Sequence, residues 1–198
     1  MKKLLVLLFL ATGVMSVHAQ KIGLKAGLNF ANAVYEESQT SLSTDALVGP
    51  QFGIVADFPI DSEWAFNTGI LYSQKGLKMD FIGVEVKVPV QYLEVPLNLA
   101  YKHDLESLKL FVQAGPYLAL GLSAKAKSGG EEEKIEFGSD DDQIKGYDAG
   151  LNIGAGVEIE KLQLGVNYGL GLLDLENDND AKMKNSVFSI TLAFFFGN

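Results

Sequence analysis

The 198-residue chain contains no cysteine, which excludes thiolate nucleophiles, disulfides, zinc–thiolate sites and iron–sulfur clusters. It contains no arginine either: its 16 basic residues are all lysines, and they are outnumbered by 25 acidic residues. The guanidinium fork that holds a phosphate or a carboxylate through two hydrogen bonds is therefore missing. The formal net charge of −9 argues against nucleic acid as a partner.

Apolar runs long enough to cross a membrane as a helix are also missing, because such a helix needs about 20 consecutive apolar residues. The longest candidate, residues 110–124, is interrupted by Gln113, Gly115, Pro116 and Gly121. Nevertheless, 47% of the residues are hydrophobic and the mean hydropathy is positive, +0.14. The apolar side chains therefore need a place other than a membrane-spanning helix.

The first 19 residues have the pattern of an export signal. Two lysines give a positive start, residues 4–14 form a short apolar segment, and Val17-His18-Ala19 supplies the small residues that precede a cleavage site. We therefore predict a signal peptide at residues 1–19 and a single mature domain at residues 20–198.

Apolar and polar residues alternate with a period of two along eight later segments, each about ten residues long, which is typical of β-strands. One face carries large aliphatic and aromatic residues and no charge. The opposite face carries Gly, Asn and Gln with scattered charges. The segments are residues 22–30, 48–58, 64–73, 93–102, 108–120, 148–159, 162–172 and 187–196.

Connections between these segments alternate between short and long. The second and third, fourth and fifth, and sixth and seventh segments are joined by a few residues, whereas the other connections are long and polar. This alternation is typical of an outer-membrane barrel with short periplasmic turns and long extracellular loops. We therefore predict an all-β fold in the outer membrane: an eight-stranded, antiparallel, up-and-down transmembrane β-barrel, closed because hydrocarbon cannot hydrate an open sheet edge.

The uncharged face of the segments separates this barrel from a soluble one. Side chains can just fill an eight-stranded interior, which suits small and amide residues better than the large aliphatic set. A soluble periplasmic, lipocalin-like ligand-binding barrel needs an outer face rich in lysine and glutamate, and neither face is so composed. We predict lipid outside and a polar lumen inside, with the soluble barrel as the alternative.

Several short motifs resemble those of the small outer-membrane β-barrels of Bacteroidetes, often labelled porin-family or PorT-like. They are Ala19-Gln20-Lys21-Ile22-Gly23-Leu24-Lys25-Ala26-Gly27, Tyr92-Leu93-Glu94-Val95-Pro96-Leu97, Ala114-Gly115-Pro116-Tyr117 and Gly154-Ala155-Gly156-Val157-Glu158. The architecture is similar to that of OmpA- and OmpX-type barrels. The resemblance implies contact with outer-membrane lipid and lipopolysaccharide. It also implies assembly by the barrel-assembly machinery, whose terminal signal the aromatic last strand resembles, although Gly197 and Asn198 follow the final Phe.

Charged residues on the inward face form the first candidate site. Opposite charges in a narrow, low-dielectric lumen should pair, because isolated charges are costly there. We expect a polar plug that stabilises the barrel, with a gate or a small conductive path as the alternative. The plug residues are Lys25, Asp57, Glu94, Lys102, Lys109 and Glu158.

Aromatic residues near the segment ends form the second candidate feature, a membrane-interface girdle. Tyr72 and Tyr92 suit the outer interface, and Trp64 and Tyr101 suit the inner one.

Residues 75–91 continue the alternation beyond this girdle. Their apolar residues, however, occupy the alternate positions that are polar in the third and fourth segments, as if the register switches near Tyr72 and Tyr92. We expect a protruding hairpin with a valine-rich face and a free edge at Val84, Val86 and Val88. Such an edge can recruit a protein partner by β-strand addition. The alternative is that the hairpin packs against neighbouring loops.

Catalysis, cofactors and metals receive little support. After export one histidine remains, His103, beside Asp104 in a short connection, so we expect no catalytic residue and no cofactor. The last long connection carries alternating carboxylates that are weak metal candidates: Asp174, Glu176, Asp178 and Asp180. They lack the glycine and the distal glutamate of an EF-hand loop. A solvated acidic loop, which divalent ions can bridge to lipopolysaccharide, is the better interpretation.

These observations predict a non-enzymatic outer-membrane protein with an envelope-structural or surface-interaction role through its extracellular loops. One alternative is a small channel or a PorT-like accessory in secretion. The other alternative is the soluble periplasmic barrel.

Overall fold

A computed structural model describes residues 21–37, 40–43, 45–81, 84–138, 143–175 and 182–196. The predicted signal peptide and three of the four metal candidates (Glu176, Asp178 and Asp180) lie outside the described residues. Among the residues that are described, no helix is long and apolar enough to cross a bilayer.

Eight long antiparallel strands form a barrel, and two short strands extend it at one end. β2 (Thr40–Ser43) pairs with β1, and β7 (Glu131–Ile135) pairs with β6. The barrel strands are β1 (Lys21–Glu37), β3 (Leu47–Pro59), β4 (Trp64–Phe81), β5 (Val84–Leu105), β6 (Leu108–Ser128), β8 (Tyr147–Ile159), β9 (Leu162–Gly171) and β10 (Lys182–Phe196).

The first and last barrel strands pair with each other and close the sheet. Their register runs without interruption from Ile22 opposite Phe196 to Glu36 opposite Lys182. Each remaining barrel strand pairs with its neighbours in the order β3, β4, β5, β6, β8, β9. The predicted eight-stranded antiparallel barrel is confirmed, and closure supplies the backbone hydrogen bonds that a membrane cannot.

Large apolar side chains point outward along every barrel strand. Ile54 on β3 and Ile153 on β8 are 57% and 62% exposed, although both are among the most hydrophobic residue types. Polar residues such as Asn29 and Asp57 are buried instead. This inside-out distribution is the one that lipid around the barrel requires.

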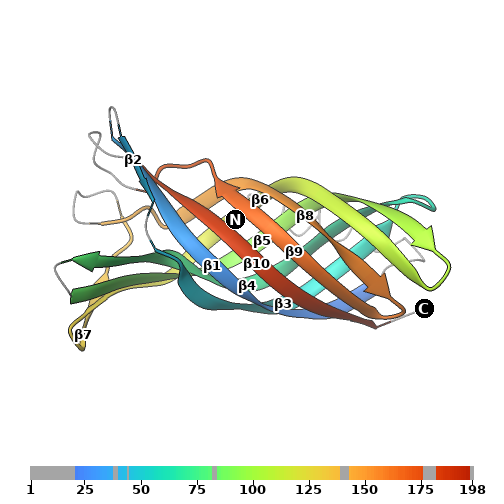
Figure 1. The fold of residues 1–198 in the computed structure, drawn as a ribbon, viewed down its shortest axis with the longest axis horizontal. Coiled ribbons are helices and arrows are strands. Elements are labelled where there is room, and N and C mark those ends of the chain that lie inside the picture. Colours follow the sequence, from blue (N-terminus) through green and yellow to red (C-terminus); the bar gives the residue numbers. More distant parts are fainter. Residues whose placement is uncertain are drawn as a thin grey trace, which may run out of the picture.

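The short turns gather at the end of the barrel where the C-terminus lies (Figure 1). In the β3–β4 turn the Asp61 carboxylate accepts backbone hydrogen bonds from Glu63 and Trp64, both at 2.8 Å. The β5–β6 and β8–β9 turns each contain a glutamate in the left-handed region, Glu106 with φ 54° and Glu160 with φ 53°. At the other end the β4–β5 and β6–β7 hairpins project beyond the barrel, as predicted for the extracellular side.

The polarity of the strands inverts near this extracellular end, although the alternation of side chains continues. β4 and β5 remain paired from Leu71 opposite Glu94 to Phe81 opposite Val84. Along β4 the inward position changes from Lys75 to the buried, apolar Leu77, and polar Lys78 follows on the outward face. Above the membrane water replaces lipid outside, so apolar residues move to the inside.

The predicted switch of register between β4 and β5 is therefore wrong, because what changes is the surrounding medium. A register shift does occur between β5 and β6. Gln91 lies opposite Ser123 and Tyr92 opposite Gly121, so that Leu122 is an extra residue in β6. This β-bulge turns the end of β6 so that it follows the projecting hairpin.

Barrel closure has a direct test by electrophoresis in detergent. We expect the purified mature protein to migrate faster unboiled than boiled, because the closed hydrogen-bonded barrel stays compact until it is heated. Equal mobility of the two samples, with the protein soluble in the absence of detergent, would contradict the membrane barrel.

Candidate functional site

The first part of the site is an ion-pair cluster at the periplasmic end of the lumen. The Lys102 ammonium contacts the Asp57 carboxylate and lies 2.9 Å from the Glu158 carboxylate, and Lys21 lies 3.3 Å from Glu158. Asp57 and Glu158 are buried. Three of the predicted plug residues, Asp57, Lys102 and Glu158, are thus brought together, and each buried carboxylate has a positive partner.

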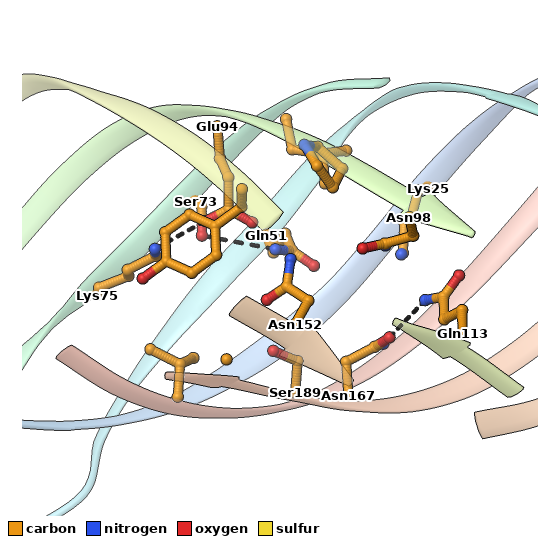
Figure 2. Close-up of a pocket in the computed structure, with 15 residues that line it drawn as sticks. Lys25, Gln51, Ser73, Lys75, Glu94, Asn98, Gln113, Asn152, Asn167 and Ser189 are labelled. Carbon is orange, nitrogen blue, oxygen red and sulfur yellow. Dashed lines mark hydrogen bonds and ion pairs between the residues drawn. The ribbon is translucent and has the colours of Figure 1, made fainter. Parts of the chain in front are cut away.

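A second ion-pair cluster lies toward the extracellular end and centres on Lys75. Its ammonium is 2.8 Å from the Glu94 carboxylate (Figure 2). It also lies 3.2 Å from the Asp148 carboxylate and 4.0 Å from the centre of the Tyr117 ring. Asp148 also accepts hydrogen bonds from the Tyr117 hydroxyl at 3.0 Å and from the Asn185 amide at 2.9 Å. This network ties together β4, β5, β6, β8 and β10.

Sequence reasoning named Glu94 but missed both of its neighbours in this cluster. Lys75 follows Leu71 and Ser73 at alternate positions, so extending the inward face of β4 by one step would have found it. Asp148 shares the inward alternation of Asn152 on β8. For Lys75, the supposed change of the apolar face near Tyr72 obscured this signal.

Amide and hydroxyl groups fill the lumen between the two clusters. Gln113 donates a hydrogen bond to Asn167 at 2.7 Å and accepts one from Asn67 at 3.2 Å. Ser189 donates to Asn29 at 2.9 Å, and Asn29 donates onward to Ser73 at 3.0 Å. Figure 2 shows four of these side chains pointing into the lumen from different strands: Ser73, Gln113, Asn167 and Ser189.

Small cavities of about 30 Å³ and about 20 Å³ lie in this layer. Such volumes hold one or two water molecules at most. Lys25, another predicted plug residue, lines both cavities and interacts electrostatically with Glu94.

Two aromatic rings cross the lumen because glycines on β8 leave room for them. A Cβ atom on Gly156 would lie 2.7 Å from the Phe111 ring and 2.1 Å from the Leu164 carbonyl oxygen. A Cβ atom on Gly150 would lie 2.6 Å from the Tyr117 ring. Large rings on β6 thus lie against glycines on β8, and together they fill a narrow interior.

The extracellular mouth is closed by apolar side chains. One buried group comprises Val90, Tyr92, Tyr117, Ala119 and Ala124, with Phe137 packed against it. Next to it lies a second group, formed by Ala33, Leu77, Leu175 and Met183, and Val88 contacts both groups.

Three of the four predicted girdle residues face outward. Trp64 and Tyr101 make an edge-to-face contact at 5.3 Å, and Tyr72 stacks on Phe52 at 4.9 Å. The placement of Tyr92 in the girdle is wrong. Tyr92 alternates with Glu94 on β5, so it points inward and is fully buried in the mouth.

Lys109 does not join the lumen clusters. It lies opposite Glu158 in the strand register, but its ammonium pairs with Asp104 at 3.0 Å and its side chain is 43% exposed. At the rim of the barrel a long lysine can reach water, which solvates the charge better than the lumen does.

The predicted free edge is wrong at Val86 and Val88, because β6 extends alongside β5 there, whereas Val84 lies beyond the end of this pairing. Val86 lies opposite Ser128, and β7 then pairs with β6. The ends of β4, β5 and β6 together with β7 form a four-stranded extension, here called the extracellular sheet (residues 75–81, 84–91, 123–128 and 131–135).

The residues that the structure describes offer few other candidates for metal binding or catalysis. They contain no group of three or more His, Asp or Glu side chains placed to hold a metal ion. Asp174, the metal candidate that is described, accepts a hydrogen bond from the Met183 backbone at 3.0 Å. His103 is exposed at the periplasmic end of β5.

The Lys75 cluster provides a matched pair of variants. We expect Lys75→Met to destabilise the barrel by about 3 kcal/mol or more, because Glu94 and Asp148 remain buried without their cation. Lys109→Met removes the same charge from the exposed rim and should change stability by less than about 0.5 kcal/mol. Unfolding by urea in detergent micelles measures both variants, and similar effects would argue against a structural role for the Lys75 cluster.

Solved barrels share this architecture. Neisserial surface protein A is 16% identical over 90% of this chain and 100% of that chain, with a TM-score of 0.50. OprG from Pseudomonas aeruginosa is 12% identical over 90% and 95% of the two chains, with a TM-score of 0.49. Ail from Yersinia pestis is 14% identical over 89% and 98%, with a TM-score of 0.47. At these identities the likeness concerns the fold alone.

The sequence itself supplies the family. No curated protein matches the chain. A family model described as "Outer membrane protein beta-barrel domain" matches residues 18–177. The prediction of a cell outer-membrane location is confirmed, and the soluble periplasmic alternative is wrong. The chain belongs to the outer membrane protein β-barrel domain family.

Proposed function

We propose that this protein is a non-enzymatic, non-conducting outer-membrane barrel that acts at the cell surface through its extracellular sheet. The observation that carries the proposal is the contrast between a filled lumen and a well-formed projecting sheet. The alternating layers of ion pairs, amides and apolar side chains leave cavities for single water molecules. They argue against the alternative of a small channel.

The extracellular sheet has the properties of a presented surface. Its strands are hydrogen-bonded from the barrel wall to the hairpin tips, with Phe81 opposite Val84 and Ser128 opposite Glu131. Buried Leu77 and Val90 anchor its inner face to the mouth of the barrel. A rigid sheet on a rigid barrel costs little conformational entropy when it binds.

Two more specific functions would both use this surface. A structural role in the envelope requires contacts with lipid and lipopolysaccharide around the barrel. A PorT-like accessory role in secretion, suggested by the Bacteroidetes resemblance, requires a protein contact on the same sheet. We favour the envelope role, since the surface next to the membrane is strongly polar and the valine edge is covered. Delivery to the membrane by the barrel-assembly machinery belongs to the same proposal.

Conductance tests the closed lumen. We expect the folded protein in planar lipid bilayers to give no stable ohmic current. Lys102→Ala should likewise give no stable current, because the amide layer and the Lys75 cluster still fill the lumen. Discrete conductance steps from the unmodified protein would overturn the non-conducting assignment.

Cysteine labelling tests the surface presentation, since the chain has no cysteine of its own. In intact cells we expect Ser128→Cys, in the extracellular sheet, to react with a membrane-impermeant maleimide. Ser107→Cys, in a periplasmic turn, should react only after permeabilisation. A photo-crosslinker attached at Ser128→Cys should then yield adducts with envelope components. The absence of any adduct would remove the support for a surface-contact role.

A further inference from the structure

The outward face of the extracellular sheet is rich in lysine, although the chain as a whole is acidic. Lys78, Lys87 and Lys127 lie directly opposite one another on β4, β5 and β6. In the neighbouring row Lys125 lies opposite Lys134 of β7. Like charges in direct cross-strand register are destabilising, so folding alone gives no reason for this arrangement.

Two glutamates pair with these lysines. Glu85 lies 2.6 Å from Lys78 and 2.5 Å from Lys87. Glu132 lies 3.1 Å from Lys125 and 2.5 Å from Lys127. Each glutamate is thus shared by two lysines. Asp45 and Asp80 add negative charge near Lys78.

Both shared glutamates stay ionised and directed at their lysines. Hydrogen bonds from Lys78 and then Lys87 lower the pKa of Glu85 to about 2. Hydrogen bonds from Lys127 and then Lys125 lower the pKa of Glu132. The glutamates therefore hold the lysine side chains in place from one side, toward the hairpin tips.

On the membrane side of these lysines lies a surface cleft of about 410 Å³ with no acidic residue in its lining. Its walls are Lys78, Lys87, Lys125 and Lys127, together with Ala46, Leu47, Val48, Gln74, Pro89 and Gln91. Lys87 and Lys127 also line a second cleft nearer the hairpin tips. Four ammonium groups beside amide donors form a binding environment for phosphate, since lysine binds phosphate as a point charge.

The height of this cleft places it at the outer surface of the lipid layer. Val48 at its base is an exposed apolar residue of the lipid-facing band. Gln74 is two residues beyond Tyr72, whose ring stacks on Phe52 in that band. At about 3.3 Å per residue, Lys78 lies roughly 20 Å further along the strand than Tyr72, or about 15 Å higher at a strand tilt of about 40°. The cleft lies between these two levels.

We propose that this lysine-lined cleft binds the phosphate groups of a phosphorylated glycolipid in the outer leaflet, an inference that rests on the envelope role proposed above. The lipid's acyl chains lie against the apolar band below Val48, and its phosphates are held by the four lysines. This contact needs no bridging divalent cation, unlike the acidic loop contact that the sequence suggested.

The test uses the full mature barrel in uncharged detergent micelles, with EDTA present, and native mass spectrometry to titrate bound lipid. The probes are bisphosphorylated lipid A, the same lipid without phosphates, and inorganic phosphate. We expect saturable binding of the bisphosphorylated lipid alone. The variant K87Q/K127Q should weaken that binding about tenfold or more, since it removes two of the four ammonium groups that hold the phosphates.

The matched control is K109Q/K161Q, which removes two lysines from the periplasmic end. It should bind the lipid like the unmodified protein, and both variants should keep the unboiled mobility of a folded barrel. Equal affinity for the phosphate-free lipid would overturn the site. So would unchanged binding by K87Q/K127Q or an equal loss in the control. Inorganic phosphate that binds as tightly as the lipid would overturn the assignment to a lipid headgroup.

Discussion

Backbone hydrogen bonding inside hydrocarbon is the constraint on which the rest of this structure depends. No water is present there to satisfy an open strand edge, so β1 and β10 must pair along their whole length. Closure with eight strands gives a lumen so narrow that inward side chains meet across it. The ion pairs of Lys102 and Lys75, the amide layer and the rings over Gly156 and Gly150 all follow from this crowding.

The same strands run first through lipid and then through water, which explains the inverted polarity near the extracellular end. In the membrane β4 and β5 turn apolar residues outward to lipid and polar residues inward. Beyond the membrane the pairing continues, but Leu77 and Val90 turn inward and Lys78 and Lys87 outward. A continuous ladder thus makes a membrane barrel and a water-exposed sheet from one hairpin, with the lysines gathered at the boundary.

Most of the barrel could be predicted from the sequence, because a period of two and alternating connection lengths are local signals. The inward positions of Asp57, Glu94, Lys102 and Glu158 followed from the same alternation. Which charges meet did not follow, since pairing depends on strand tilt and on how far each side chain reaches. For this reason Lys109 extends to the rim of the barrel and pairs with Asp104. Lys75, on the extracellular part of β4, reaches both Glu94 and Asp148.

By itself, then, the sequence determined the number of barrel strands, their direction and the face that meets lipid, because alternation along a strand dictates burial. Only the tertiary structure decided the partners of the lumen charges, the inward position of Tyr92 and the covering of the valine edge by β6. It also placed Lys78, Lys87, Lys125 and Lys127 around one cleft. These four residues come from three strands and a span of 50 residues, and only cross-strand register brings such distant positions together.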